Sequence, residues 1–388
     1  MRKIKVAISQ RIIPHYRVPV FKELANRENI DLTVFYGDGF KTGSQANANS
    51  IEGFKAKKLF TIFLNFKGKD STKQLRVWHP FLFFHLLFNR FDVVIAEPTT
   101  NFYNDIFIYL YCKIFRKKFI WYEAGSVPSK ERTLFRKIID PIVSIFIKGA
   151  DAYITYTSFA DKSLIRDFNI EQKKIFRAQN TVDTSNIDEE TLQFTPLINA
   201  KKEELKLNDC KVSLYIGGIE LRKNINNLIT ATTNLNNEGI KAKTLIVGDG
   251  PDKELILSKM TEQEKINTIF AGKQIEKATL FILLSDIVVL PSQGGLSVIQ
   301  AFACKKPFIG SKEIEHGGII DYVDDGINGF LVEENDIADL QKSLKTLFTD
   351  ENLYSIFSIN AYKKSKEITL AKMVDGIQSA INYTKNKQ

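Results

Sequence analysis

Short apolar segments alternate with amphipathic segments along most of the chain. In the first half, buried strands are predicted over residues 4–9, 32–36, 92–96, 118–122, 152–157 and 175–178. In the second half, they are predicted over residues 212–216, 243–247, 266–271, 287–290, 307–310 and 329–332. Helical periodicity fills most of the intervals, which is typical of parallel β-α-β units. The pattern therefore predicts an α/β protein with two doubly wound domains.

Three segments interrupt this alternation. Residues 37–58 are rich in Gly, Asn and Ser, which favours a mobile loop. Residues 75–88 are rich in aromatic residues and are interpreted as a helical region, and the polar segment 180–209 is interpreted as the linker between the domains. At the end of the chain, Met373, Ile377 and Ile381 share one face of a predicted helix, so this helix needs an apolar partner.

Composition narrows the class of protein further. Of the 388 residues, 44% are hydrophobic and 26% charged, which is a globular balance, and the net charge of +9 favours anionic partners. The cysteines are Cys112, Cys210 and Cys304, and their wide spacing argues against a disulfide framework or a zinc site. No apolar run reaches the length of about 18 residues that a spanning helix needs, and the N-terminus is interpreted as a strand rather than a signal peptide.

Glycines follow four of the predicted strands in the second half. They are Gly217 and Gly218, Gly248, Gly272, and the pair Gly294 and Gly295. The last pair precedes a helix whose first amides lack intrahelical partners, which is a favourable place for a phosphate. Each turn alone is also compatible with an ordinary strand-to-helix connection. Because the carboxyl ends of parallel strands meet at one edge, the four together indicate a phosphorylated ligand.

The segments GGIELRKN, LIVGDGP, SDIVVLPSQGGLSVIQAFACKKPFI and DGINGFLVEEND, in this order, resemble glycosyltransferase family 4. The resemblance implies a GT-B fold, with two Rossmann-like domains facing each other across a cleft. Residues 1–190 would form the acceptor-binding domain, with the helix at 370–388 packing back on it, and residues 205–368 would bind the nucleotide sugar. It further implies a nucleotide-sugar donor, retention of anomeric configuration, and no metal or other cofactor.

The resemblance implies that Lys223 contacts the donor pyrophosphate and that Arg222 assists it, although Arg222 is equally compatible with a solvated residue at the start of a helix. The full set of expected donor-binding residues is Gly217, Gly218, Arg222, Lys223, Gly248, Gly272, Gly294, Gly295, Leu296, Ser297 and Gln300. This sequence departs from the family at three positions. Gly218 replaces an arginine, while Ser292 and Gln300 replace two glutamates, of which the second normally holds the ribose hydroxyls. The amides of Gly294, Gly295 and Leu296 are therefore expected to hold the sugar or the β-phosphate.

In the first half, polar residues follow strands that face the cleft in this fold. His15 and Arg17 follow the first strand, Glu97 follows the third, and Glu123 ends the next one. Glu123, His15 and Lys223 are the expected catalytic residues, and Arg17 and Glu97 are expected to bind the acceptor. For each, the alternative is a polar residue satisfied by a neighbouring loop. His316 matches a histidine of some relatives, although a helix-capping role is equally consistent with its position.

The resulting hypothesis is a retaining hexosyltransferase that moves a sugar to a glycan or lipid-linked saccharide, as in the synthesis of cell-surface polysaccharides. A non-catalytic sugar-nucleotide-binding protein and a sugar-nucleotide epimerase remain alternatives. A nicotinamide oxidoreductase is disfavoured because no GxGxxG follows the first strand, and no clustered basic motif indicates nucleic acid. The expected location is the cytoplasm. The aromatic and basic segment 78–90 is compatible with core packing or with peripheral contact with an anionic membrane.

Overall fold

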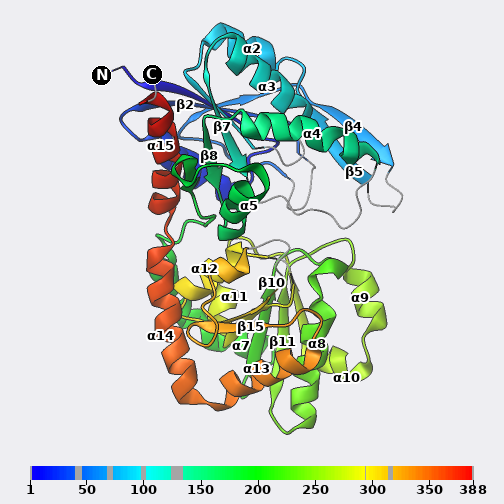
Figure 1. Ribbon diagram of the computed structural model, residues 1–388. Coiled ribbons are helices and arrows are strands. Elements are labelled where there is room, and N and C mark those ends of the chain that lie inside the picture. The colour runs from blue at the N-terminus through cyan, green and yellow to red at the C-terminus, as the bar shows by residue number, and fades with distance from the viewer. Residues whose placement is uncertain are drawn as a thin grey trace. The chain divides into compact units, whose positions relative to one another are not determined.

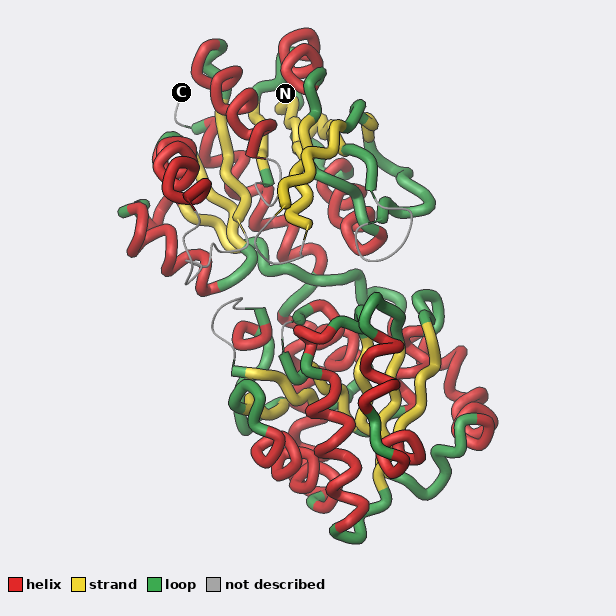
Figure 2. The backbone as a smooth tube through the Cα atoms, turned by 90° about the vertical axis from the view of Figure 1, so that its right-hand side faces the viewer, coloured by secondary structure: helices red, strands yellow, loops and turns green. Residues whose placement is uncertain are grey.

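A computed structural model of the chain describes residues 2–39, 46–67, 73–97, 102–123, 134–292, 294–312 and 318–386. The chain forms two units, each with its own sheet covered by helices (Figures 1 and 2). The N-terminal unit comprises Met1–Asn180 and Leu370–Gln388, and the C-terminal unit comprises Thr181–Thr369. Both ends of the chain therefore belong to the N-terminal unit (Figure 1).

The sheet of the N-terminal unit contains seven parallel strands in the order β3-β2-β1-β6-β7-β8-β9. These strands are β1 (Ile4–Ser9), β2 (Ile30–Tyr36), β3 (Lys55–Lys58), β6 (Val93–Ala96), β7 (Lys118–Glu123), β8 (Ala152–Thr155) and β9 (Ile175–Arg177). In the register of the central strands, Val6 pairs with Leu32 on one side and with Val93 on the other. A strand order that runs in both directions from β1 is typical of doubly wound sheets.

Both faces of this sheet are buried, because successive side chains of a strand point to opposite faces. Val6 and Ile8 lie in one hydrophobic core, whereas Ala7 between them lies in the other. The first core is closed by α1 (Val18–Ala25) and α15 (Leu370–Lys385). The second core is closed by helices α2 (Leu82–Asn89), α3 (Phe102–Ile114), α4 (Leu134–Lys148) and α5 (Ser158–Phe168). Short 3-10 turns, η1 (His15–Arg17) and η2 (Gln172–Lys174), complete the unit.

The last helix of the chain, α15, packs on β7, β8 and β9 of the N-terminal unit. Its apolar stripe is buried in the first core, through Met373, Val374, Ile377, Ala380 and Ile381. The apolar stripe predicted from the sequence thus attaches the last helix to the N-terminal unit, to which the chain returns after residue 369.

Two segments of the N-terminal unit differ from the sequence prediction. The predicted helical region at 75–88 begins instead with β5 (Lys73–Trp78), which pairs antiparallel with β4 (Ile62–Lys67). The predicted mobile loop contains the edge strand β3, in which all residues are exposed. Strand β3 has no buried face of its own, so pairing with β2 decides its conformation. Part of that predicted loop, residues 40–45, lies outside the described residues.

The C-terminal unit has six parallel strands in the order β12-β11-β10-β13-β14-β15. Their bounds are β10 (Lys211–Ile216), β11 (Ala242–Val247), β12 (Thr268–Gly272), β13 (Ile287–Leu290), β14 (Phe308–Ser311) and β15 (Gly329–Val332). The later helices are α8 (Ile225–Asn237), α9 (Lys253–Lys259), α10 (Glu262–Asn267), α11 (Ala278–Leu284), α12 (Leu296–Ala303), α13 (Ile337–Thr349) and α14 (Glu351–Glu367). Two 3-10 turns, η4 (Leu221–Lys223) and η5 (Ile319–Asp321), lie in the loops after β10 and β14.

The segment predicted to be an inter-domain linker is part of the C-terminal unit. It forms α6 (Ile187–Phe194), the 3-10 turn η3 (Thr195–Leu197) and α7 (Ile198–Glu204), and both helices pack on α11. Only Ile187 and Phe194 of α6 are buried, so the segment is polar enough to resemble a linker. The unit boundary accordingly lies at residue 180, and not within the predicted interval of 190–205.

No helix in the described ranges is both long and apolar enough to span a membrane.

Candidate active site

Four strand ends meet at the carboxyl edge of the C-terminal sheet, as predicted from the glycines that follow them. Backbone hydrogen bonds join the loops after these strands. The amide of Gly217 donates to the carbonyl of Val247 at 3.0 Å, and the amide of Gly248 donates to the carbonyl of Gly272 at 2.9 Å. The loops after β10, β11 and β12 are therefore held side by side as one backbone surface.

Two of the glycines at this edge are there for different reasons. A Cβ atom on Gly248 would lie 1.8 Å from the carbonyl oxygen of Gly217, which no side chain tolerates. Gly272 has φ +69°, a left-handed conformation that favours glycine, and a Cβ there would meet nothing within 4 Å. Gly248 is thus required by packing within the protein, whereas the surface at Gly272 is open to a ligand.

The turn between β13 and α12 presents an uncapped helix N-terminus. No side chain caps α12, and its first turn carries no acidic residue. A Cβ on Gly295 would have its nearest neighbour 3.9 Å away, on the ring of Tyr322, so the space beside this glycine is open. The free amides and the helix dipole together favour an anion at this position. Residue 293 in this turn is outside the described part of the chain.

Ser292 and Gln300, which replace the two glutamates of the family, differ in accessibility. Ser292 is 2% exposed, so its hydroxyl offers almost no surface to a ligand. Gln300 and Ser297 lie on α12 and are half-buried. A neutral amide such as that of Gln300 can accept a hydrogen bond but contributes no charge.

The basic residues near this edge lie in the 3-10 turn after β10. Arg222 is exposed and forms an ion pair with Glu220 at 2.6 Å, so part of its charge is already compensated. Lys223 is half-buried and ends the turn, immediately before Asn224 in a left-handed conformation. Arg222 and Lys223 therefore place two cations in the loop that follows β10.

At the carboxyl edge of the N-terminal sheet, a buried network joins residues from three loops. Arg17 is 5% exposed, and its guanidinium donates to the Oη atom of Tyr156. Tyr156 in turn donates to Oε1 of Glu97 at 2.5 Å, and the Arg17 guanidinium lies 3.5 Å from the same oxygen. Arg17 also lies over the ring of Tyr156, 4.8 Å from its centroid. A buried charge of this kind persists only when it is paired and hydrogen-bonded.

Burial sets the protonation of this network. It raises the pKa of Tyr122 to about 12 and the pKa of Tyr156 well above its usual range. Burial by itself lowers the pKa of Arg17, but attraction to Tyr156, Tyr122 and Glu97 outweighs it and raises the pKa well above the ordinary value. The phenols therefore stay neutral and Arg17 stays charged, so the hydroxyl of Tyr156 can donate a hydrogen bond to the Glu97 carboxylate.

The structure brings together Arg17 and Glu97 among the predicted acceptor residues. His15 is exposed, with its ring edge-on to Tyr16 at 5.6 Å. Glu123 ends β7, but its side chain lies outside the described residues, as does His316. Tyr122 and Tyr156 are additions that the sequence interpretation missed. Tyr156 could have been found from the sequence, since it directly follows β8 and therefore lies at the same edge of the sheet as Glu97.

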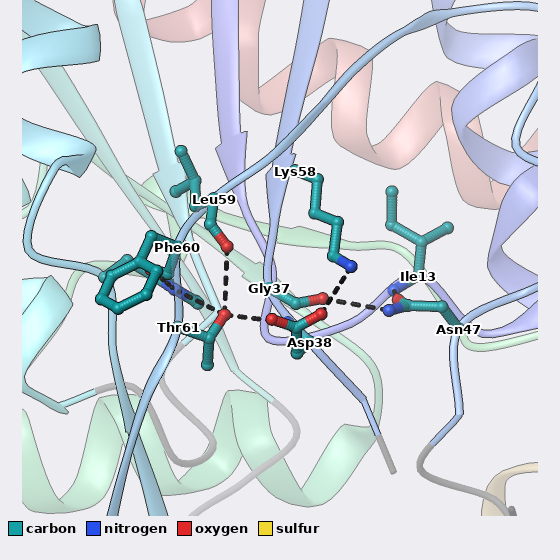
Figure 3. Close-up of polar contacts among 9 residues, drawn as sticks. Ile13, Gly37, Asp38, Asn47, Lys58, Leu59, Phe60 and Thr61 are labelled. Carbon is teal, nitrogen blue, oxygen red and sulfur yellow. Dashed lines mark hydrogen bonds and ion pairs between the residues drawn. The ribbon is translucent and has the colours of Figure 1, made fainter. Parts of the chain in front are cut away.

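A second polar network fixes the loops beside this edge (Figure 3). The side chain of Asn47 accepts from the amide of Ile13 at 2.8 Å and donates to the carbonyl of Gly37 at 3.0 Å. Asp38 donates its amide to Thr61 at 2.9 Å, and its carboxylate pairs with Lys58 at 2.6 Å. These contacts join the segments that follow β1, β2 and β3, and so hold the loop that leads into Arg17.

In the parts of the chain that the structure describes, no three His, Cys, Asp or Glu side chains gather in a way that could hold a metal ion.

Comparison with known proteins agrees with this geometry. Residues 198–364 match the family model described as glycosyl transferases group 1. An uncharacterized glycosyltransferase of Methanocaldococcus jannaschii is 28% identical over 396 residues, which cover 95% of each chain. The N-acetyl-alpha-D-glucosaminyl L-malate synthase of Bacillus anthracis is 29% identical over 174 residues, 44% of each chain.

Among solved structures, Alr3699/HepE of Anabaena, in complex with UDP, has a TM-score of 0.74 at 14% identity. The match covers 98% of this chain and 99% of that one. The predicted GT-B fold is thereby confirmed, and the sequence matches support a glycosyltransferase of group 1.

Proposed function

We propose that this chain is a retaining glycosyltransferase of family 4 that transfers a hexose from a nucleotide sugar to a hydroxyl of a glycan or lipid-linked saccharide. Cell-surface polysaccharide synthesis is the proposed context. The nucleotide sugar binds the C-terminal unit and the acceptor binds the N-terminal unit. A UDP-linked donor is the first choice, because the Anabaena structure with the same fold holds UDP.

The observation that carries this proposal is the open backbone surface at Gly295 and the uncapped start of α12. A diphosphate needs hydrogen-bond donors and positive potential, and this turn supplies both without any side chain. Lys223 adds a positive charge from the loop after β10, which is the strand next to β13 in the sheet. Gln300 receives the ribose hydroxyls as a neutral acceptor.

Catalysis then rests on stabilising the diphosphate that departs. The bond between the anomeric carbon and the β-phosphate oxygen breaks, and the acceptor oxygen bonds to the same face of that carbon. The electron pair stays on the diphosphate, where Lys223 and the amides of Gly294, Gly295 and Leu296 oppose the developing charge. Donors fixed at the place where charge develops are a large catalytic contribution in many enzymes. The buried Ser292 has no part in this step.

On the acceptor side, the Arg17–Tyr156–Glu97 network presents a preorganised polar surface at its sheet edge. Arg17 and Glu97 bind the acceptor saccharide, and Tyr156 keeps the Glu97 carboxylate oriented. Glu123, at the end of the neighbouring strand β7, takes up the proton of the acceptor hydroxyl, and His15 assists from the loop after β1.

A thermal-shift screen of nucleotide sugars, followed by a transfer assay with the donor that binds, tests the function. A donor at about 100 times its Kd should raise the free energy of unfolding by about 2.7 kcal/mol. Transfer should release the nucleoside diphosphate only when an acceptor is present, and the product should keep the donor's anomeric configuration. Binding without transfer to any saccharide acceptor would favour the non-catalytic alternative, and isomerised nucleotide sugar would favour the epimerase.

Two variants separate the backbone-amide site from a role of Ser292. Gly295→Val fills open space, so the variant should fold normally but lose donor binding and transfer. Ser292→Ala, at a buried position, should lower kcat less than about tenfold. If Ser292→Ala proves as damaging as Gly295→Val, the amides do not carry the reaction.

A further inference from the structure

The outer surface of the N-terminal unit carries two matching apolar stripes that are exposed in the described chain. On α2 and the residue before it, Phe81, Phe84 and Phe88 are exposed by 52%, 51% and 77%. On α3, Phe107, Leu110 and Ile114 are exposed by 37%, 45% and 64%. Both sets follow the spacing i, i+3, i+7, which places each set on one side of its helix. We refer to these six residues as the α2–α3 face.

The two stripes form one surface, because α2 and α3 pack against each other (Figure 1). Helix α2 leads into β6 and helix α3 leads into β7, and these two strands are parallel neighbours, so the carboxyl ends of the two helices lie at the same edge of the sheet. Phe60, itself 62% exposed, extends the surface through a ring contact with Phe81 at 6.2 Å. Scattered exposed apolar residues are normal on a globular protein, but a contiguous set of this kind marks a contact site.

Positive charge borders this surface. Each helix is followed by an arginine in a left-handed conformation, Arg90 after α2 and Arg116 after α3, and both are exposed. Lys117 follows directly, and Lys57 lies close enough to α2 to lower the pKa of His85, after the larger effect of burial. Among the described residues, none of Arg90, Arg116 and Lys117 belongs to an ion pair within 4.0 Å. The one acidic residue of the two helices is Asp105, which is buried.

We propose that the α2–α3 face docks on an anionic membrane surface. Its phenylalanine and aliphatic side chains enter the interface between headgroups and acyl chains, and Arg90, Arg116 and Lys117 contact lipid phosphates. A large apolar stripe joined to basic residues is the combination that binds peripheral helices to anionic lipid. The absence of exposed acid on α2 and α3 favours this occupant, because acidic side chains would be repelled by the lipid headgroups.

Flotation of the full chain with vesicles tests this proposal. Vesicles of phosphatidylcholine alone are compared with vesicles that also contain phosphatidylglycerol. Wild type should float with the anionic vesicles at low salt and lose most binding at high salt, because salt screens the attraction. Replacing Arg90, Arg116 and Lys117 by Gln should weaken binding about fivefold per charge removed. Phe88→Ser with Ile114→Ser should weaken binding at least about tenfold.

The C-terminal unit provides a matched control. Leu192 and Ile266 are exposed by 78% and 64%, nearly the same as Phe88 and Ile114. Leu192→Ser with Ile266→Ser should leave flotation unchanged. Equal loss in both double variants, full retention in Phe88→Ser with Ile114→Ser, or equal binding to neutral vesicles would overturn the proposal. It would also be overturned by a dimer in analytical ultracentrifugation that Phe88→Ser with Ile114→Ser dissociates, since a second copy would then cover the face.

Discussion

Gly218 lies where the resembling family has an arginine, and its surroundings leave room for one. A Cβ on Gly218 would meet only Oε1 of Glu220, at 3.4 Å, and the residue is exposed after β10. We therefore expect Gly218→Arg to add a positive charge beside the donor phosphates without disturbing the fold. The Kd for the nucleotide sugar should fall about fivefold at low salt and less at high salt, as measured by calorimetric titration.

Gly218→Gln is the control, since glutamine has a long polar side chain without the charge. If Gln tightens binding as much as Arg does, the gain comes from contact area and not from charge. If neither variant changes the Kd, the loop after β10 does not approach the donor phosphates.

Asp105 is a residue whose burial has consequences for stability. It is 2% exposed, and its Oδ1 atom has no hydrogen-bond partner in the described part of the chain. Burial raises the pKa of this carboxyl well above its ordinary value of 3.8. Because the folded state holds the proton more tightly than the unfolded state, stability is highest below that value and falls as pH rises towards the folded pKa.

Asp105→Asn removes the titrating group at nearly constant shape. The variant should gain about 1 kcal/mol or more in the free energy of unfolding at pH 7, and its loss of stability between acid and neutral pH should be smaller. Urea unfolding at several pH values measures both effects. Asn104→Ala is the comparison, because Asn104 accepts from the His79 amide at 2.7 Å and should cost stability at every pH. An unchanged pH slope in Asp105→Asn would mean that the carboxyl is paired.

Helix α15 is the element in which a single glycine decides how closely the helix packs. A Cβ on Gly376 would lie 2.1 Å from the carbonyl oxygen of Arg177 and 3.0 Å from Cα of Ala178. Both contacts are to backbone at the end of β9, which cannot rotate away as a side chain could. In an isolated helix, Gly→Ala is favourable by about 1 kcal/mol, so here propensity and packing act in opposite directions.

We expect packing to dominate, so Gly376→Ala should lower the free energy of unfolding by a net amount of about 1–2 kcal/mol. Thermal or urea denaturation of the full chain measures the change. Gly218→Ala provides a matched control, because its Cβ meets only a flexible carboxylate oxygen. A Gly376→Ala variant that is more stable than wild type would show that α15 can move away from β9 at no cost.

At the scale of the whole molecule, the division into two units predicts which fragment folds alone. Residues 181–369 contain a complete sheet, both of its helical layers, and the segment 187–204 that packs on α11. This fragment should fold cooperatively and bind the nucleotide sugar with a Kd close to that of the full chain. A fragment that begins at residue 205 lacks α6 and α7, so it uncovers the apolar side of α11 and should be less stable or aggregate.

Circular dichroism, thermal unfolding and donor titration of the two fragments check this prediction. Phe194→Ala in the full chain isolates the same contact, since Phe194 is 8% exposed, and should cost about 3 kcal/mol. If the two fragments are equally stable, the contact of segment 187–204 with α11 does not stabilise the unit, and the segment is a linker as the sequence predicts.

Much of the architecture was readable from the sequence, because the elements that form the sheets carry their own signal. The apolar residues of β1 and β13 are buried, and so is the apolar stripe of α15, as the sequence pattern predicts. The glycines at 217, 248 and 272 were equally informative, since a strand end without a Cβ atom implies a turn or a close approach.

Other features depended on contacts between distant segments. Strand β3 is exposed at every residue, so only its pairing with β2 makes it a strand. The burial of Arg17 required Tyr156 and Glu97, which lie 139 and 80 positions away and converge because β1, β6 and β8 end at the same edge. Local pattern determined the strands and helices of this protein because burial of one face is a property of each segment. Tertiary structure alone decided the polar networks, because a buried charge is stabilised only by the partner that folding brings to it.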